Sequence, residues 1–155
     1  TRRTSSAASD VYKRQISNFF NQMKVIPVSI SYEFDPNDLN KAREVYETEV
    51  NGFYEKKENE DLESISRGIS GFKGSVILNI GNMMNFESDS YEIVADQITN
   101  EISNQFHNHP TNKDALSILN EDLKLEDNEY FLERLKNETD EVKRILLNQY
   151  ANSAN

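Results

Sequence analysis

The sequence predicts an α/β fold in which a strand–helix–helix–strand unit is followed by an all-helical C-terminal extension. Two short segments rich in β-branched residues, 24–34 and 74–81, enclose two segments whose apolar residues recur at helical spacing. Beyond about residue 86 only helical spacing occurs. This order of elements is typical of an α/β unit, whose further sheet partners we expect upstream.

The first predicted strand lies in KVIPVSISYEF, residues 24–34. Ile26, Val28, Ile30 and Tyr32 alternate along it with other residues, which favours a strand with one apolar face. Pro27 lies near its start, where a missing backbone N–H is tolerated.

Two helices and a second strand are expected next. Asp35 is a candidate N-cap with Pro36 at the first helical position, and apolar residues follow at helical spacing: Leu39, Ala42, Val45, Tyr46 and Val50. After a polar loop, the second helix covers 60–70 through Leu62, Ile65 and Ile69, and glycines mark its end. GSVILNIG, residues 74–81, supplies the second strand.

The C-terminal extension, residues 86–155, carries four helical patterns. The longest runs from Tyr91 to Phe106 with an apolar residue at every fourth position: Val94, Ile98, Ile102 and Phe106. Shorter patterns cover residues 115–119, 130–136 and 141–150. We expect these stripes to be core positions.

Composition excludes several classes of protein. The chain has 155 residues, of which 36% are apolar and 28% charged, and it has no apolar run of the ~18 to 20 residues that a membrane span requires. Without cysteine it has no disulfide, no thiolate nucleophile and no cysteine-based metal site. A net charge of -10 argues against binding nucleic acid by charge. These features are compatible with a cytoplasmic location.

Residues 1–15 differ from the rest, with four basic residues and one acid. The stretch SSAASDVYKRQ, from Ser5 to Gln15, resembles the in-frame translation of a transposase sequencing adaptor. We therefore treat 1–15 as a non-native tail and expect the natural reading frame to begin upstream of Ile16, so that the chain is a fragment.

Three segments carry a resemblance to a known family. VIPVSISYE, from Val25 to Glu33, is similar to the fourth signature block of the bacterial glycerol-phosphate and 1-acylglycerol-3-phosphate (lysophosphatidate) acyltransferases. EDLESISRGISGFKG, residues 60–74, and LLNQYAN, residues 146–152, resemble the remainder of one subgroup. The resemblance runs from about Phe19 to Asn152. It implies that 16–85 is the C-terminal part of an acyltransferase domain.

The resemblance implies an O-acyltransferase of phospholipid and glycerolipid metabolism. Such enzymes move a fatty acyl group from acyl-CoA or acyl carrier protein, the co-substrate, to a hydroxyl of glycerol phosphate or a lysophospholipid, with no bound cofactor. A His in a His-x4-Asp motif takes the proton from that hydroxyl, and the Asp orients the imidazole. The location implied is cytoplasmic or peripheral inner membrane, with membrane contact made by the full-length protein.

His109 and Asp114 have the same His-x4-Asp spacing, and Asn108 and Thr111 extend the match. In the family, however, this motif precedes the proline block, whereas here it follows Pro27 by about eighty residues. The other interpretation is a helix start with Thr111 as N-cap and Asp114 in the first turn. We favour the helix start, so we expect no catalytic residue in this fragment and place the true motif upstream.

The substrate-binding candidates are Pro27, Tyr32 and Glu33. By resemblance, the proline block shapes the acceptor pocket or the end of a strand. Tyr32 and Glu33 either reach toward substrate or divide between core and solvent, and the sequence leaves both alternatives open.

Two further groups have ordinary explanations. His107 and His109 lack a third convergent ligand, so we expect no metal site. An acidic group, which we expect to be a solvated face, consists of Glu58, Glu60, Asp61 and Glu63. The competing hypothesis for the whole chain is a non-enzymatic binding or regulatory module that shares only the fold.

Overall fold

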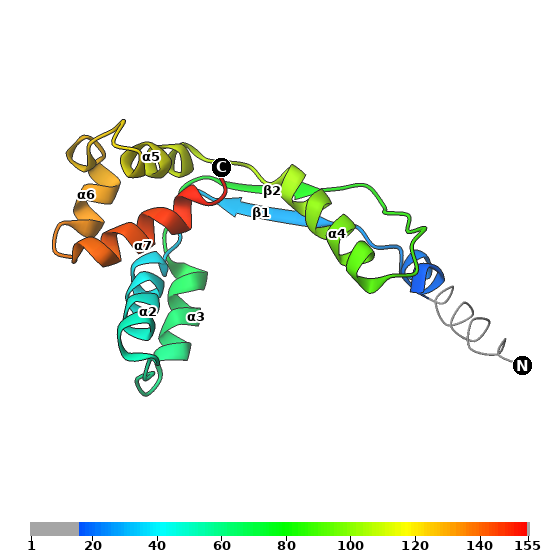
Figure 1. Ribbon diagram of the computed structural model, residues 1–155, viewed down its shortest axis with the longest axis horizontal. Coiled ribbons are helices and arrows are strands. Elements are labelled where there is room, and N and C mark those ends of the chain that lie inside the picture. The colour runs from blue at the N-terminus through cyan, green and yellow to red at the C-terminus, as the bar shows by residue number, and fades with distance from the viewer. Residues whose placement is uncertain (1–15, 155) are drawn as a thin grey trace, which may run out of the picture. The chain divides into compact units, whose positions relative to one another are not determined.

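The computed structural model describes residues 16–154 (Figure 1). Within them the fold is mixed α/β and mostly helical, with a two-stranded antiparallel sheet, which confirms the predicted fold class. The predicted non-native tail, 1–15, lies outside the described residues. The division of the remaining chain at residue 85 stays a prediction.

The elements follow in the predicted order. A helical segment covers 16–23, and then come β1 (Val28–Tyr32), α2 (Asp38–Asn51), α3 (Glu60–Ser70) and β2 (Val76–Ile80). The C-terminal extension contains α4 (Tyr91–Gln105), α5 (Pro110–Leu119), the 3-10 turn η1 (Leu125–Asp127), α6 (Glu129–Leu135) and α7 (Asp140–Ala151).

Two predicted helix starts were wrong. Asp35 does not cap α2, because its side chain accepts a hydrogen bond from the Asn37 N–H at 2.8 Å and closes a turn before the helix begins. At α5 the N-cap is His109 and the first helical residue is Pro110, so Thr111 is inside the helix and Asp114 lies beyond its first turn.

The chain forms two compact units that each draw on two stretches of sequence. Among the described residues, unit 1 contains 16–30 and Ile77–His107, and unit 2 contains Ser31–Val76 and 108–154. We describe each unit by itself.

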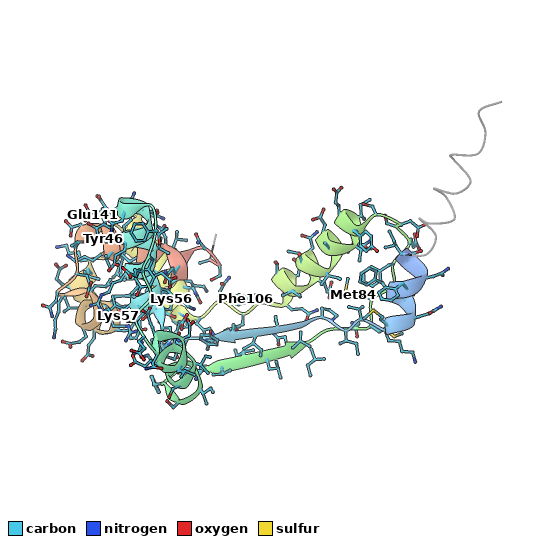
Figure 2. The ribbon with its side chains drawn as sticks, turned by 90° about the horizontal axis from the view of Figure 1, so that it is seen from below. Tyr46, Lys56, Lys57, Met84, Phe106 and Glu141 are labelled. Atoms are coloured by element: carbon cyan, nitrogen blue, oxygen red, sulfur yellow. The ribbon has the colours of Figure 1, made fainter. Side chains whose placement is uncertain are left out.

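Unit 1 has a small apolar core. Ile16, Phe86 and Val94 are buried, and partly buried residues pack against them: Phe20, Val25, Met84 and Ile98. Met84, labelled in Figure 2, lies beside the helical segment 16–23. The predicted stripe of α4 therefore contributes its first two positions, Val94 and Ile98, to this core.

The core of unit 2 is larger and is formed where α7 packs against α2 and α5. Buried apolar residues come from α2, α5, α6 and α7: Ala42, Ala115, Phe131, Leu135, Val142, Leu146, Leu147, Tyr150 and Ala151. The two last predicted helices thus supply most of it, as their apolar spacing indicated.

One face of the sheet is open in unit 1. Ser29 is buried and its hydroxyl donates to the Gln105 carbonyl at 3.0 Å, whereas Val28 and Ile30 are 45% and 57% exposed. On β2, Leu78 and Ile80 are 54% and 68% exposed. We call Val28, Ile30, Leu78 and Ile80 the open sheet face. It is apolar, while the covered face of β1 carries small hydroxyl side chains.

Candidate functional site

Pro27 lies at the predicted place, directly before β1, and is buried in unit 1. Its carbonyl accepts a hydrogen bond from the Gly81 N–H at 2.9 Å. A Cβ placed on Gly81 would come within 2.8 Å of the Pro27 ring and 2.4 Å of the Gln105 amide nitrogen. The ring therefore packs against a position where only glycine fits.

Tyr32 and Glu33 end the family block and lie in unit 2. Tyr32 is 37% exposed, whereas Glu33 is partly buried and its carboxylate accepts from the Ser75 N–H at 3.1 Å. Gly74, with φ of 63°, makes room for that carboxylate, since a Cβ there would lie 2.6 Å from Glu33 Oε2. Of the two, Tyr32 is the more accessible to a ligand.

His109 and Asp114 do not resemble an exposed catalytic pair. His109 is only 2% exposed, and its backbone N–H donates to the Asn112 side-chain oxygen at 2.7 Å. Asp114 is partly buried, and its carboxylate accepts from the Asn128 amide at 2.9 Å. His109 thus takes part in a contact at the start of α5, and Asp114 joins α5 to the N-cap residue of α6. Their assignment as a coincidental match stays a prediction.

The most elaborate polar arrangement in unit 2 surrounds Asp38, which is 1% exposed. The phenols of Tyr130 and Tyr150 donate to Asp38 Oδ2 at 2.8 and 2.9 Å. Arg134 forms two hydrogen bonds to the same carboxylate, one of them from Nε to Oδ2 at 2.9 Å. We call Asp38, Tyr130, Arg134 and Tyr150 the Asp38 cluster.

The position of Asp38 follows from the local chain. It is the first residue of α2, where a carboxylate suits the helix dipole, and its Oδ1 accepts from the Leu39 N–H at 2.6 Å. Tyr130 and Arg134 are four positions apart on α6, so both side chains lie on one face of that helix. Tyr150 comes from the last turn of α7. Three helices thus meet at one buried carboxylate.

The electrostatics keep the two phenols and the guanidinium of the cluster protonated at neutral pH. Burial raises the pKa of the Tyr150 phenol above its ordinary value, and the charge of Asp38 raises it further. Burial and the Asp38 charge also raise the pKa of Tyr130, although its hydrogen bond with Tyr150 acts in the opposite direction. Burial lowers the pKa of Arg134, but the hydrogen bond and charge of Asp38 outweigh burial and leave it raised.

These properties suit structure rather than proton transfer. A general base near neutral pH needs a pKa near that pH, and both phenols are shifted away from it. An ion pair with every oxygen hydrogen-bonded is the form in which a buried carboxylate is tolerated. No local sequence pattern reveals this cluster, because Asp38 is separated from Arg134 by 96 positions and from Tyr150 by 112.

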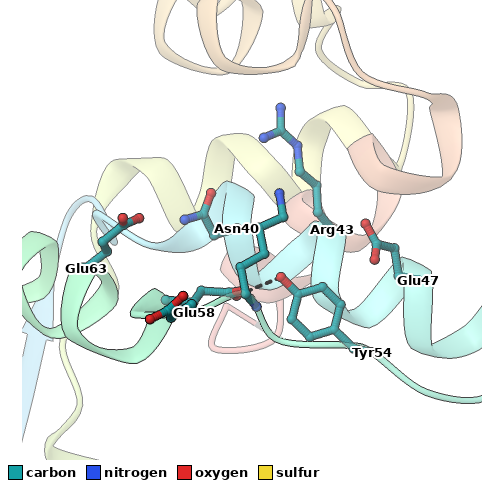
Figure 3. A pocket seen from close by; sticks show the side chains of 8 residues that line it. Asn40, Arg43, Glu47, Tyr54, Glu58 and Glu63 are labelled. Carbon is teal, nitrogen blue, oxygen red and sulfur yellow. Dashed lines mark hydrogen bonds between the residues drawn. The ribbon is translucent and has the colours of Figure 1, made fainter.

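A pocket of about 270 Å³ opens between α2 and the start of α3 (Figure 3). Its wall contains most of the predicted acidic group and residues of α2 and the following loop: Asn40, Arg43, Glu47, Tyr54, Lys57, Glu58, Glu60 and Glu63. The Tyr54 phenol donates to the Glu60 carboxylate at 2.6 Å, and Arg43 pairs with Glu138. The wall thus carries two basic residues among four acidic ones, so the pocket is strongly charged.

The Tyr54–Glu60 bond shifts both partners. It raises the pKa of Tyr54 to about 12 and lowers the pKa of Glu60, to which the Lys57 N–H also donates. Both shifts move these two groups away from neutral pH, so neither Tyr54 nor Glu60 is tuned as a general acid or base there.

Two further pockets are lined mainly by amides and charged groups. One lies in unit 1, beside α4: Asn82, Met83, Met84, Asn85, Gln97, Asn100, Glu101 and Asn104. The other lies between α2 and α7 in unit 2: Val45, Glu49, Arg144, Ile145, Asn148, Gln149 and Asn152. None of Pro27, Tyr32 and Glu33 lines these two pockets or the pocket between α2 and α3.

Within residues 16–154, no three His, Cys, Asp or Glu side chains are arranged to hold a metal ion. None of the helices in that range combines the length and apolar composition needed to cross a bilayer. No protein family, curated protein or solved structure matches the chain.

Proposed function

We propose that this chain is the C-terminal part of an O-acyltransferase. The reaction transfers a fatty acyl group from acyl-CoA or acyl carrier protein to a hydroxyl of glycerol phosphate or a lysophospholipid. A base removes the hydroxyl proton as the oxygen attacks the thioester carbonyl, and the thiol leaves. That base lies in a His-x4-Asp motif upstream of residue 16.

The observation that supports the proposal most is the surroundings of β1, which carries the family block. Its covered face holds Ser29 and Ser31, whereas apolar Val28 and Ile30 belong to the open sheet face. The solvated face of an antiparallel sheet is normally polar, so apolar side chains on an open face indicate a missing covering layer. The open sheet face is what we expect of a strand whose second covering layer comes from the remainder of an acyltransferase domain.

The surroundings of His109 also support the proposal that the catalytic base is another residue. A general base must reach the acceptor hydroxyl, and His109 is 2% exposed at the start of α5. The Asp114 carboxylate accepts a hydrogen bond from Asn128. In this proposal both residues hold α5 and neither touches substrate.

The proposal includes the partners and location of such an enzyme. The acceptor is glycerol phosphate or a lysophospholipid, and the full-length bacterial protein works in the cytoplasm or at the inner membrane surface. Tyr32, which is 37% exposed at the end of β1, is the residue of the family block that we expect to contact the acceptor.

An acyl-transfer assay tests the proposal. Purified residues 16–155 should transfer no acyl group from acyl-CoA to glycerol 3-phosphate or lysophosphatidate, whereas the full-length protein should. Transfer by 16–155 that disappears in His109→Ala would overturn the placement of the base. Reading the DNA upstream of codon 16 is an independent test, since the proposal requires an in-frame N-H-x-S/T-x-x-D motif there.

A second candidate function is a binding module without chemistry. Helix α3 favours it, because Leu62, Ile65 and Ile69 form an apolar stripe that is 59–78% exposed. Exposed apolar patches commonly mark interaction sites. A start codon near Ile16, with no catalytic motif before it, would favour this module over the enzyme.

A further inference from the structure

The six residues that follow β1, Glu33–Asp38, connect the family block to α2. We call them the post-strand segment. In unit 2 this segment is contacted by side chains from three helices of the C-terminal extension, α5, α6 and α7. These contacts have no part in the chemistry proposed above, so they call for an explanation of their own.

Helix α5 holds the beginning of the post-strand segment. The Thr111 hydroxyl donates to the Glu33 carbonyl at 2.8 Å, and Thr111 is 5% exposed. The next residue, Asn112, donates from its amide to the Tyr150 carbonyl at 2.9 Å. The stretch that imitates a catalytic motif thus joins the segment to α7.

Helices α6 and α7 hold the remainder of the segment. The Tyr130 ring lies 4.2 Å, centre to centre, from the Phe34 ring. The Tyr150 phenol accepts from the Asp35 N–H at 2.9 Å while donating to Asp38 at the same distance. One phenol therefore fixes the segment at its middle and at its end.

These bonds restrict the backbone next to the acceptor candidates. Buried hydrogen bonds to backbone groups fix a loop in one conformation, since breaking them leaves polar atoms unsatisfied. A substrate-binding residue must be held to within about 0.5 Å, and supporting side chains normally provide that. The post-strand segment begins at Glu33 and directly follows Tyr32.

We infer that Thr111 and Tyr150 are positioning residues, which hold the post-strand segment so that Tyr32 and Glu33 keep a fixed orientation toward the acyl acceptor. The inference rests on the proposed function. It gives the helical extension a role in acceptor binding through contacts that never touch the acceptor.

Amide hydrogen exchange in residues 16–155 tests whether Tyr150 holds the post-strand segment in one conformation. Tyr150→Phe keeps the ring and removes the hydroxyl, so exchange at the Asp35 amide should accelerate about tenfold. Ser153→Ala is the matched control, because it removes a hydroxyl bonded to the Tyr150 carbonyl at 3.2 Å and should leave Asp35 within about twofold. Equal acceleration at amides throughout unit 2 would mean general loosening and would overturn the inference.

The second variant is Thr111→Val, which keeps the shape of the side chain and removes its donor. It should shift the carbonyl carbon resonance of Glu33. Thr139→Val, at the N-cap of α7, is its control and should leave that resonance unchanged.

Steady-state kinetics of the full-length protein test the positioning role. Tyr150→Phe and Thr111→Val should raise the KM for the acceptor at least about fivefold, with the KM for acyl-CoA within about twofold. An unchanged acceptor KM in an active enzyme would overturn the inference and leave the proposed function standing. A folded wild-type protein without acyl transfer would refute the function and the positioning role together, while the exchange result would still report whether the two residues hold the segment.

Discussion

At the scale of single residues, the Asp38 cluster joins one buried carboxylate to three polar side chains from two other helices. A carboxylate that is 1% exposed is stable there only because two phenols and a guanidinium satisfy its oxygens. Removing one member should therefore lower the free energy of unfolding by more than one hydrogen bond contributes, because the remaining polar groups stay buried without that partner.

Asp38→Ala should lower the free energy of unfolding by about 3–5 kcal/mol, since it leaves Arg134 and two phenols without their common partner. Asp140→Ala is the control, because Asp140 pairs with Lys143 while its side chain is 94% exposed. That change should cost less than about 1 kcal/mol. Urea unfolding measures both, and equal losses would contradict the role given to Asp38.

The stabilisation that the Tyr54–Glu60 hydrogen bond provides should depend on pH in both the alkaline and the acidic range. The Tyr54 pKa is raised to about 12, so the stabilisation is complete below the ordinary value of about 10 and is lost as pH rises through the folded value. The Glu60 pKa is lowered, so its contribution is present above the ordinary carboxyl value and is lost as pH falls through the folded one.

An NMR titration of the Tyr54 ring should give a midpoint near 12 in the wild type. In Glu60→Gln the midpoint should move toward about 10. A wild-type Tyr54 phenol that titrates at the ordinary value of about 10 would contradict this prediction.

At the scale of elements, local sequence predicted much and long-range contacts explain the rest. The bounds of α3 match its predicted range, and β2, α4, α6 and α7 differ from theirs by two residues at most. The start of α2 was misplaced because the Asp35 side chain caps a turn instead of the helix. The long-range polar partners of Tyr150 lie in the post-strand segment, on α5 and on α6, and no periodicity in α7 reveals them.

Apolar residues in the buried core and apolar residues on the open sheet face should respond differently to substitution. Leu146→Ala, at a fully buried position of α7, should cost about 2–5 kcal/mol of unfolding free energy. Ile30→Thr, on the open sheet face, should stay within about 0.5 kcal/mol in residues 16–155. A loss at Ile30 as large as that at Leu146 would show that the face is covered within this chain.

At the scale of the whole molecule, the two units differ in the size of their cores. Among residues 16–154, unit 1 buries three apolar residues in its cluster and unit 2 buries nine. Apolar burial is the main source of stability, so unit 1 should open at a lower free energy than unit 2. The sequence could not predict this division, since each unit combines two separate stretches of chain.

Native-state hydrogen exchange measures the difference in opening free energy between the two units. Amides around Val94 in α4 should exchange at lower opening free energy than those around Leu146 in α7. Leu146→Ala should accelerate exchange in α2, α5 and α7 more than in α4. The same protection in both helices would indicate that the units open together.

The candidate site was predictable only in part. Pro27 lies where the sequence placed it, before a strand, and Tyr32 is exposed at the end of that strand. The sequence indicated a helix start near His109 but placed the N-cap two residues late, at Thr111, and it did not reveal the contacts of this helix start with Glu33 and Tyr150. Those contacts join residues 38 and 78 positions apart, which a single sequence does not reveal.

The central claim is that this chain belongs to an acyltransferase whose base is not His109. The most direct measurement is acyl transfer from labelled acyl-CoA to glycerol 3-phosphate and to lysophosphatidate by the full-length protein and by its His109→Asn variant, which retains a good N-cap residue. The account predicts transfer to at least one acceptor, with the variant within about twofold of the wild type. A folded full-length protein that transfers to neither acceptor, or a loss of about 100-fold or more in the folded variant, would contradict it.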